Sequence, residues 1–220
     1  MNPNSLPDAR VTLRARFRSA TREAILEAAA DLLGADGATQ TRMEDIAARA
    51  GVAVGTVYNY FEDRKTLVSA LLETRIKGLL EALDASLAPP AKGAAATPAP
   101  DARTAFQADL ERFVAAFTAH IESNRFLFAV LRDEERVSGV DATSQSRRTT
   151  LGGELLGKAG RLMDRGLKAR VLRRDDAELY GAMLVGMLRG LALRSLTRTS
   201  ADLRRDMAAM VRVFMSGAAR

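Results

Sequence analysis

Residues 41–65 read TRMEDIAARAGVAVGTVYNYFEDRK and decide the fold of the N-terminal part of the chain. Thr41 and Glu44 fit a capping box, in which a hydroxyl and a carboxylate satisfy free N–H groups at the start of a helix. That helix is expected to end at Gly51, because glycine readily adopts the positive φ of a tight turn. A second short segment, residues 54–61, follows. Two helices joined in this way predict a helix-turn-helix, whose second helix lies in the major groove of DNA.

The residue types inside this segment suit close packing and contact with a phosphate. Ala47 is small where the two helices must nearly touch, and Ile46, Val52 and Val57 can form a shared core. Gly55 removes a side chain near the start of the second helix, so that free N–H groups there can approach a phosphate.

Helical periodicity continues on both sides of the segment. Apolar residues recur at three- and four-residue intervals, which predicts a helix over residues 21–37 and a long helix from residue 64 to 87. We predict an all-α fold of about nine helices, because no alternating β-branched pattern occurs. The predicted organisation is a flexible basic arm over residues 1–18, a three-helix helix-turn-helix domain over residues 19–66 and a larger helical domain over residues 67–220, with a mobile Pro- and Ala-rich linker over residues 88–102.

The composition excludes several classes of protein. The 220 residues include no cysteine, which excludes a disulfide framework, a zinc finger and a thiol nucleophile. His120 is the single histidine and cannot form a metal site alone, so we expect neither a metal nor a cofactor. We also expect no enzyme, since no nucleophile elbow, phosphate loop or paired carboxylates occur. The chain lacks a secretory signal and an apolar run of membrane-spanning length, which predicts a soluble, cytoplasmic protein.

The net charge of +6 does not by itself indicate a DNA-binding surface. Residues 1–67 contain nine Lys and Arg and nine Asp and Glu, and are therefore neutral. Five arginines nevertheless lie between Arg10 and Arg22, with no acidic residue among them. We expect the arm to contact phosphates or a minor groove of DNA.

Residues 20–70 resemble the N-terminal domain of TetR/AcrR-type transcriptional regulators. The resemblance rests on Ile25, Ala28, Ala29, Leu33, Gly37, Thr41, Asp45, Ile46, Ala47, Ala50, Gly51, Val52, Gly55, Thr56, Tyr58, Tyr60, Phe61, Arg64 and Leu67. Beyond this domain, the resemblance extends only to length and helical character. It implies a DNA-binding homodimer whose C-terminal domain binds a small effector.

Two departures from the family pattern affect the expected DNA contacts. The family commonly has serine just before the recognition helix, where this chain has Ala53, so the usual capping hydroxyl is absent. Residues 54–61 contain no Arg, Lys or Gln, which removes the usual bidentate contact to guanine. We expect Val54 to contact a thymine methyl group and Asn59 to contact a base edge or a phosphate. The predicted DNA-binding residues are Arg18, Thr41, Arg42, Val54, Gly55, Thr56, Tyr58, Asn59, Tyr60 and Arg64.

For the larger domain, the resemblance implies an effector pocket and a dimer interface formed by the last two helices. Effector sites are mostly apolar, and the candidate pocket residues are Phe113, Phe117, Phe126, Phe128, Leu131 and Met163. The candidate dimer residues are Leu184, Met187, Leu188, Leu191, Met207, Met210 and Phe214. Ordinary core packing is the alternative for both sets.

The predicted function is a ligand-responsive repressor that binds a palindromic operator as a homodimer and is released by a small apolar or amphipathic effector. Two alternatives remain open at this point. The first is an architectural protein that binds any DNA duplex, and the second is an all-α protein that binds a small molecule without regulating transcription. A regulator should prefer its own site over other DNA by about 10³-fold or more.

Overall fold

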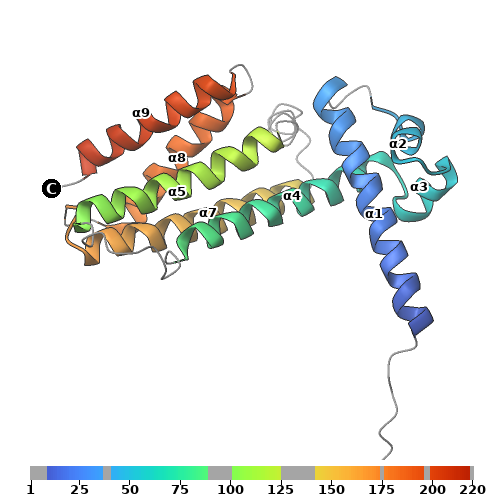
Figure 1. The fold of residues 1–220 in the computed structure, drawn as a ribbon, viewed down its shortest axis with the longest axis horizontal. Coiled ribbons are helices and arrows are strands. Elements are labelled where there is room, and N and C mark those ends of the chain that lie inside the picture. The colour runs from blue at the N-terminus through green and yellow to red at the C-terminus, as the bar shows by residue number, and fades with distance from the viewer. Residues whose placement is uncertain are drawn as a thin grey trace, which may run out of the picture. The chain divides into compact units, whose positions relative to one another are not determined.

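The computed structural model describes residues 9–36, 41–88, 101–124, 142–173, 176–195 and 199–218. These residues form eight α-helices, which confirms the all-α class (Figure 1). The helices are α1 Ala9–Asp36, α2 Met43–Ala50, α3 Val54–Tyr60, α4 Arg64–Leu87, α5 Ala102–Ser123, α7 Ala142–Lys168, α8 Ala177–Ser195 and α9 Ser200–Ala218. Over the described residues, none of the helices is both long and apolar enough to cross a membrane.

The chain divides into two compact units, Met1–Thr74 and Arg75–Arg220. The division falls inside α4, so this one helix contributes residues to both cores. Leu67 and Leu71 are buried in the first unit, whereas Leu79 is buried in the second. The boundary expected from the sequence lies earlier, near the start of α4.

Helix α1 begins at Ala9 and includes much of the stretch expected to be a flexible arm. Residues 9–18 contain no proline and are rich in Ala and Arg, which favour helix. Apolar periodicity does not reveal this part of the helix, because Leu13 and Phe17 are 55% and 66% exposed and do not enter a core. Residues 1–8 of the expected arm lie outside the described part of the chain.

The core of the first unit collects apolar residues from all four of its helices. In α1 the buried residues recur at the three- and four-residue spacing that places them on one face. The buried side chains of this unit include Ile25, Ala29, Leu33, Met43, Ile46, Ala47, Val57, Phe61, Leu67, Leu71 and Leu72. Helix α2 packs against α1 and α3 packs against α2, which gives the three-helix arrangement predicted for this domain.

In the second unit, α7 packs against α8, α5 packs against α9, and α8 and α9 pack against each other. Helix α5 is capped by the preceding residue, Asp101, whose carboxylate accepts a hydrogen bond from the Thr104 N–H at 2.9 Å. This contact lowers the pKa of Asp101. Of the linker expected over residues 88–102, residues 89–100 lie outside the described part of the chain.

Two glycines allow the helices of the second unit to approach closely. A Cβ atom on Gly181 of α8 would lie 3.1 Å from the main-chain nitrogen of Gly160 in α7. A Cβ atom on Gly166 of α7 would lie 2.6 Å from the ring of Phe106 in α5. A side chain at Gly166 would force its neighbours to move, and one at Gly181 would require a small shift of the α7 backbone.

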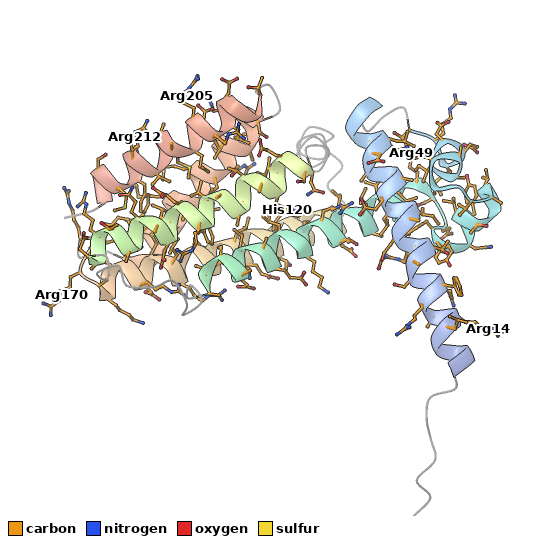
Figure 2. All side chains as sticks on the ribbon, in the orientation of Figure 1. Arg14, Arg49, His120, Arg170, Arg205 and Arg212 are labelled. Atoms are coloured by element: carbon orange, nitrogen blue, oxygen red, sulfur yellow. The ribbon has the colours of Figure 1, made fainter. Side chains whose placement is uncertain are left out.

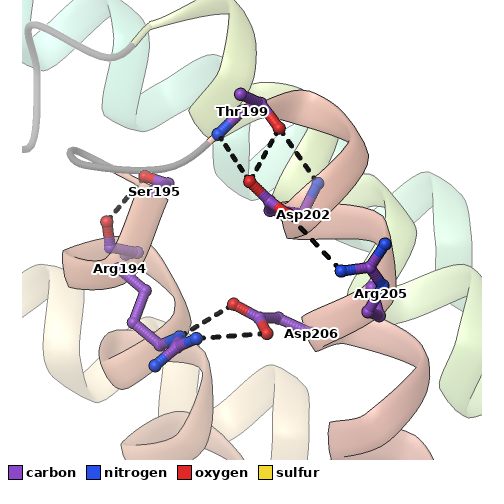
Figure 3. Close-up of polar contacts among 7 residues, drawn as sticks. Arg194, Ser195, Thr199, Asp202, Arg205 and Asp206 are labelled. Atoms are coloured by element: carbon purple, nitrogen blue, oxygen red, sulfur yellow. Dashed lines mark hydrogen bonds and ion pairs between the residues drawn. The ribbon is translucent and has the colours of Figure 1, made fainter.

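Polar contacts tie α8 to α9 and fix the start of α9 (Figure 3). Arg194 at the end of α8 donates to the carboxylate of Asp206 in α9 at 2.8 Å, and this contact raises the pKa of Arg194. The hydroxyl of Thr199 accepts a hydrogen bond from the Asp202 N–H at 3.3 Å, which caps the first turn of α9. The two helices are thus joined by a covalent connection and by an exposed ion pair.

His120, near the end of α5, provides a pH-dependent term in the stability of the second unit (Figure 2). Burial lowers the pKa of His120, and a hydrogen bond with the main chain of Arg75 only partly opposes that effect. The unfolded chain therefore binds more protons than the folded chain just below the ordinary histidine pKa of about 6.5. We expect the free energy of unfolding to fall as the pH falls through this range.

Urea denaturation at several pH values between about 5 and 7 measures this effect. The variant His120→Gln should lose the pH dependence in this range, because the chain has no other histidine. Carboxylates with lowered pKa values affect the free energy of unfolding only at more acidic pH; these are Asp63, Asp84 and Asp101. An unchanged pH profile in His120→Gln would contradict the prediction.

Candidate DNA-binding site

The start of α2 is capped one residue later than the sequence predicts. The N-cap is Arg42, and the carboxylate of Asp45 accepts a hydrogen bond from the Arg42 N–H at 3.3 Å. The predicted capping box of Thr41 and Glu44 is therefore wrong. Thr41 is instead buried, with 5% of its surface exposed, and its hydroxyl has no hydrogen-bond partner among the described residues.

The turn between α2 and α3 depends on Gly51, as the sequence predicts. Gly51 has φ 68° and ψ 31°, which is the left-handed conformation. Its N–H donates to the carbonyl of Ala48 at 3.3 Å, and the Val52 N–H donates to the carbonyl of Ala47 at 3.0 Å. These two bonds form a Schellman motif, which satisfies carbonyl groups at the end of α2.

Helix α3 is anchored on one face and exposed on the other. Val57 in the middle of α3 and Phe61 at its C-cap are buried, with 0% and 2% exposure. Val54 and Tyr58 are 36% and 47% exposed, and Asn59 is exposed as well. The N-cap is Ala53, which forms no side-chain cap. The exposed side chains of α3 therefore form a surface that is free of cationic residues.

Not all predicted DNA-binding residues lie on this surface. Gly55, Arg18 and Arg42 are exposed, and Thr56 and Tyr60 are half-buried. Arg64 is partly buried, and its Nε donates to the main-chain oxygen of Thr41 at 2.9 Å. Arg64 thus joins the start of α4 to the start of α2, a contact between distant residues that the sequence does not reveal.

The sequence also does not reveal the position of Arg22. Its guanidinium group lies 5.4 Å from the centroid of the Phe61 ring, which is a cation–π distance. Arg22 therefore connects α1 to the C-terminal end of α3. No local pattern in the sequence points to this contact.

The candidate pocket residues fall into two groups. Phe113, Phe117 and Met163 are buried in the core of the second unit, with 3% exposure or less. Phe126, Phe128 and Leu131 lie outside the described part of the chain.

Most of the candidate dimer residues are directed into the chain itself. Leu184, Leu188, Leu191 and Phe214 are buried in the core of the second unit, because α8 packs against α7 and α9 against α5. Met187, Met207 and Met210 are half-buried against the same core. Within the single chain these side chains take part in ordinary core packing, and their role in a dimer interface stays a prediction.

The opposite face of α8 carries exposed apolar residues outside the predicted dimer set. Leu179, Met183 and Leu193 are 51%, 50% and 46% exposed. Gly186 and Gly190 lie between them, and a Cβ atom at either position would meet nothing within 4 Å. We refer to these five residues as the exposed apolar stripe of α8.

Comparisons with known proteins agree with this architecture. Residues 25–71 match the sequence model of the family described as bacterial regulatory proteins, tetR family. A TetR transcription regulator from Haloarcula marismortui ATCC 43049 is 15% identical, with 92% of this chain and 100% of that chain covered and a TM-score of 0.73. The SmeT–triclosan complex is 20% identical, with 91% and 92% covered and a TM-score of 0.68. A transcriptional regulator from Cytophaga hutchinsonii ATCC 33406 is 18% identical, with 90% and 98% covered and a TM-score of 0.66.

No curated protein matches the chain. The helix-turn-helix geometry and the matched segment define a DNA-binding transcriptional regulator. The match to the tetR family covers the helix-turn-helix segment, residues 25–71, and the solved structures share the fold of most of the chain.

Proposed function

We propose that this protein is a ligand-responsive repressor that binds a palindromic operator as a homodimer. The observation that carries the proposal is the exposed surface of α3, presented by a helix-turn-helix whose turn and core are complete. In this proposal, a small apolar or amphipathic effector binds the second unit and releases the protein from its operator.

The exposed residues of α3 suggest how bases are contacted. The methyl groups of Val54 suit contact with a thymine methyl group, and the amide of Asn59 can bond to a base edge. Tyr58 and Thr56 offer hydroxyl groups to phosphates. Because α3 has no Arg, Lys or Gln, contacts to guanine would come from Arg42, which is exposed at the start of α2.

The exposed apolar stripe of α8 supports dimerisation through a second copy of the chain. Its residues, Leu179, Met183, Gly186, Gly190 and Leu193, follow alternating intervals of four and three residues. This spacing is typical of a helix that packs along its length against another helix. The glycines let the partner backbone approach, and Val213 of neighbouring α9, which is 65% exposed, can extend the interface.

A dimer would present two α3 helices related by a two-fold axis. Operators of such proteins have half-sites whose centres are about 34–36 Å apart, so that successive major grooves face the protein. The proposed operator is therefore a palindrome with this spacing.

The second unit supports an apolar effector, since Phe113, Phe117 and Met163 contribute aromatic and thioether groups to its interior. Helix α4 is the element that we propose transmits the effect, because its residues belong to both cores. Such a switch requires that the effector bind one state of the dimer more tightly than the other. A ligand that raises the Tm but leaves operator affinity unchanged would contradict this part of the proposal.

Operator binding can be tested on the full-length protein. Footprinting of the DNA beside the gene gives the operator, and fluorescence anisotropy then compares its affinity with that of a random duplex. We expect a preference of about 10³-fold or more for the operator. Equal affinity for both duplexes would instead support an architectural DNA-binding protein.

The same assay tests the contacts of α3. Asn59→Ala should weaken operator binding by about 10-fold, because one well-formed base contact contributes about 1–3 kcal/mol of discrimination. It should leave the affinity for random duplex nearly unchanged. Arg42→Ala should behave similarly, whereas Arg212→Ala, an exposed charge on α9, is the matched control. An equal loss on both duplexes would show that Asn59 and Arg42 do not read bases.

A further inference from the structure

The N-terminal part of α1 extends beyond the core of its unit. The side chains of residues 13–20 are all exposed, and the first buried residue after them is Ile25. This part of α1 therefore contributes little to the core of the unit, and its sequence is rich in arginine.

Three of the arginines lie on one face of this helix. Arg14, Arg18 and Arg22 follow each other at intervals of four residues, which places them one above the other. The same face continues into Ile25 and Ala29, which are buried. We refer to Arg14, Arg18 and Arg22 as the basic stripe of α1.

The basic stripe of α1 begins beside the recognition helix. Arg22 lies over the ring of Phe61, the residue that ends α3. Figure 2 shows Arg14 farther along α1, on the side of that helix where α3 lies. The rise of an α-helix places Arg14 about 12 Å from Arg22 along the axis.

We propose that Arg14 and Arg18 bind DNA phosphates beside the groove that α3 enters. This inference rests on the proposed operator binding and adds a second, sequence-independent contact to it. A helix about 10–12 Å across cannot enter a minor groove about 6 Å wide, so the arginines of α1 contact the outside of the duplex. The helical structure thus replaces the minor-groove contact expected from a flexible arm with a phosphate contact.

DNA fits the basic stripe better than an anionic membrane does. A helix that lies on a membrane needs a broad apolar face opposite its charges. Here the exposed large apolar residues of α1 are Leu13 and Phe17, whereas the arginines share the face that leads to α3. The chemistry and the position of the stripe both match a phosphate backbone.

Salt dependence of DNA binding tests the proposal. Each lost phosphate contact should lower the slope of log affinity against log salt by about 0.9 per protomer. We expect this change in Arg14→Ala and in Arg18→Ala, on the operator and on a random duplex alike. Arg16→Ala is the matched control, because Arg16 is exposed two residues from both arginines and faces the other side of α1.

A second variant tests whether phosphate binding depends on the face of α1 on which the arginines lie or only on the number of arginines. Inserting one alanine between Ala20 and Thr21 keeps every arginine but rotates residues 9–20 by about 100° relative to the rest of α1. Ala15 and Ser19 then take the places of Arg14 and Arg18 on the stripe. We expect the insertion to lower the slope as much as the two substitutions combined. Circular dichroism verifies that the variants remain helical.

The possible outcomes separate this inference from the proposed function. If the wild-type protein binds its operator but Arg14→Ala, Arg18→Ala and the insertion keep the wild-type slope, the inference fails and the proposed function stands. A wild-type protein without DNA binding would overturn both. Binding of wild type, but not of the Arg14→Ala and Arg18→Ala variants, to phosphatidylserine vesicles with unchanged DNA slopes would assign the stripe to a membrane and overturn the inference.

Discussion

Met183→Glu will convert the proposed dimer into a monomer and lower operator affinity by about 10²–10⁴-fold. Met183 is half exposed in the middle of the exposed apolar stripe of α8, so the substitution should leave the fold of the monomer intact. In the dimer, the same position would bury an unpaired carboxylate, which is costly. A monomer also loses the gain in affinity that comes from two linked binding sites.

Analytical ultracentrifugation at micromolar concentration measures the oligomeric state, and anisotropy measures operator binding. Leu193→Glu should give the same result, because Leu193 belongs to the same stripe. Ala208→Glu on α9 is the control, since Ala208 is exposed away from Val213. A Met183→Glu variant that remains dimeric would exclude this face of α8 as the interface.

Phe113→Ala will lower the free energy of unfolding by about 3–5 kcal/mol. Phe113 lies in the middle of α5 and is fully buried, with 0% exposure, in the core of the second unit. Truncation removes the apolar contacts of the ring and leaves a cavity that the packed helices fill only in part. For a domain of this size, such a loss is a large part of the total stability.

Urea denaturation followed by circular dichroism measures this effect. Phe17→Ala is a matched control, because the same substitution at a side chain that is 66% exposed should change stability by less than about 0.5 kcal/mol. Equal stability of Phe113→Ala and wild type would mean that the ring does not support the core.

The sequence predicts the all-α fold and the turn at Gly51 because both depend on local signals. Amphipathic periodicity marks the helices, and glycine marks the left-handed turn. The predicted start of α2 is one residue too early. Thr41 and Arg42 are adjacent, and both Glu44 and Asp45 can cap a helix. Which carboxylate does so depends on the buried position of Thr41, a tertiary feature.

Two features of the site depend on contacts that sequence spacing does not specify. From the sequence, Arg64 is expected to be a DNA-binding cation after the recognition helix. In the structure, its Nε donates a hydrogen bond to the main-chain oxygen of Thr41. Helix α8 is apolar on both faces, so its periodicity does not distinguish the side that packs on α7 from the exposed side. Leu184 and Met183 are neighbours in sequence, but Leu184 is buried and Met183 is exposed.

The shared use of α4 has a consequence for hybrid regulators. A chimera that joins this helix-turn-helix unit to the second unit of another family member must cross α4 between Leu72 and Ile76, both of which are buried. Deleting one residue there would turn one half of the helix by about 100° and shorten it by about 1.5 Å. Because each half of α4 packs in the core of its own unit, that unit would turn together with its half of the helix. Exchange of modules in such proteins must therefore conserve the residue count of this helix as well as its amino acids.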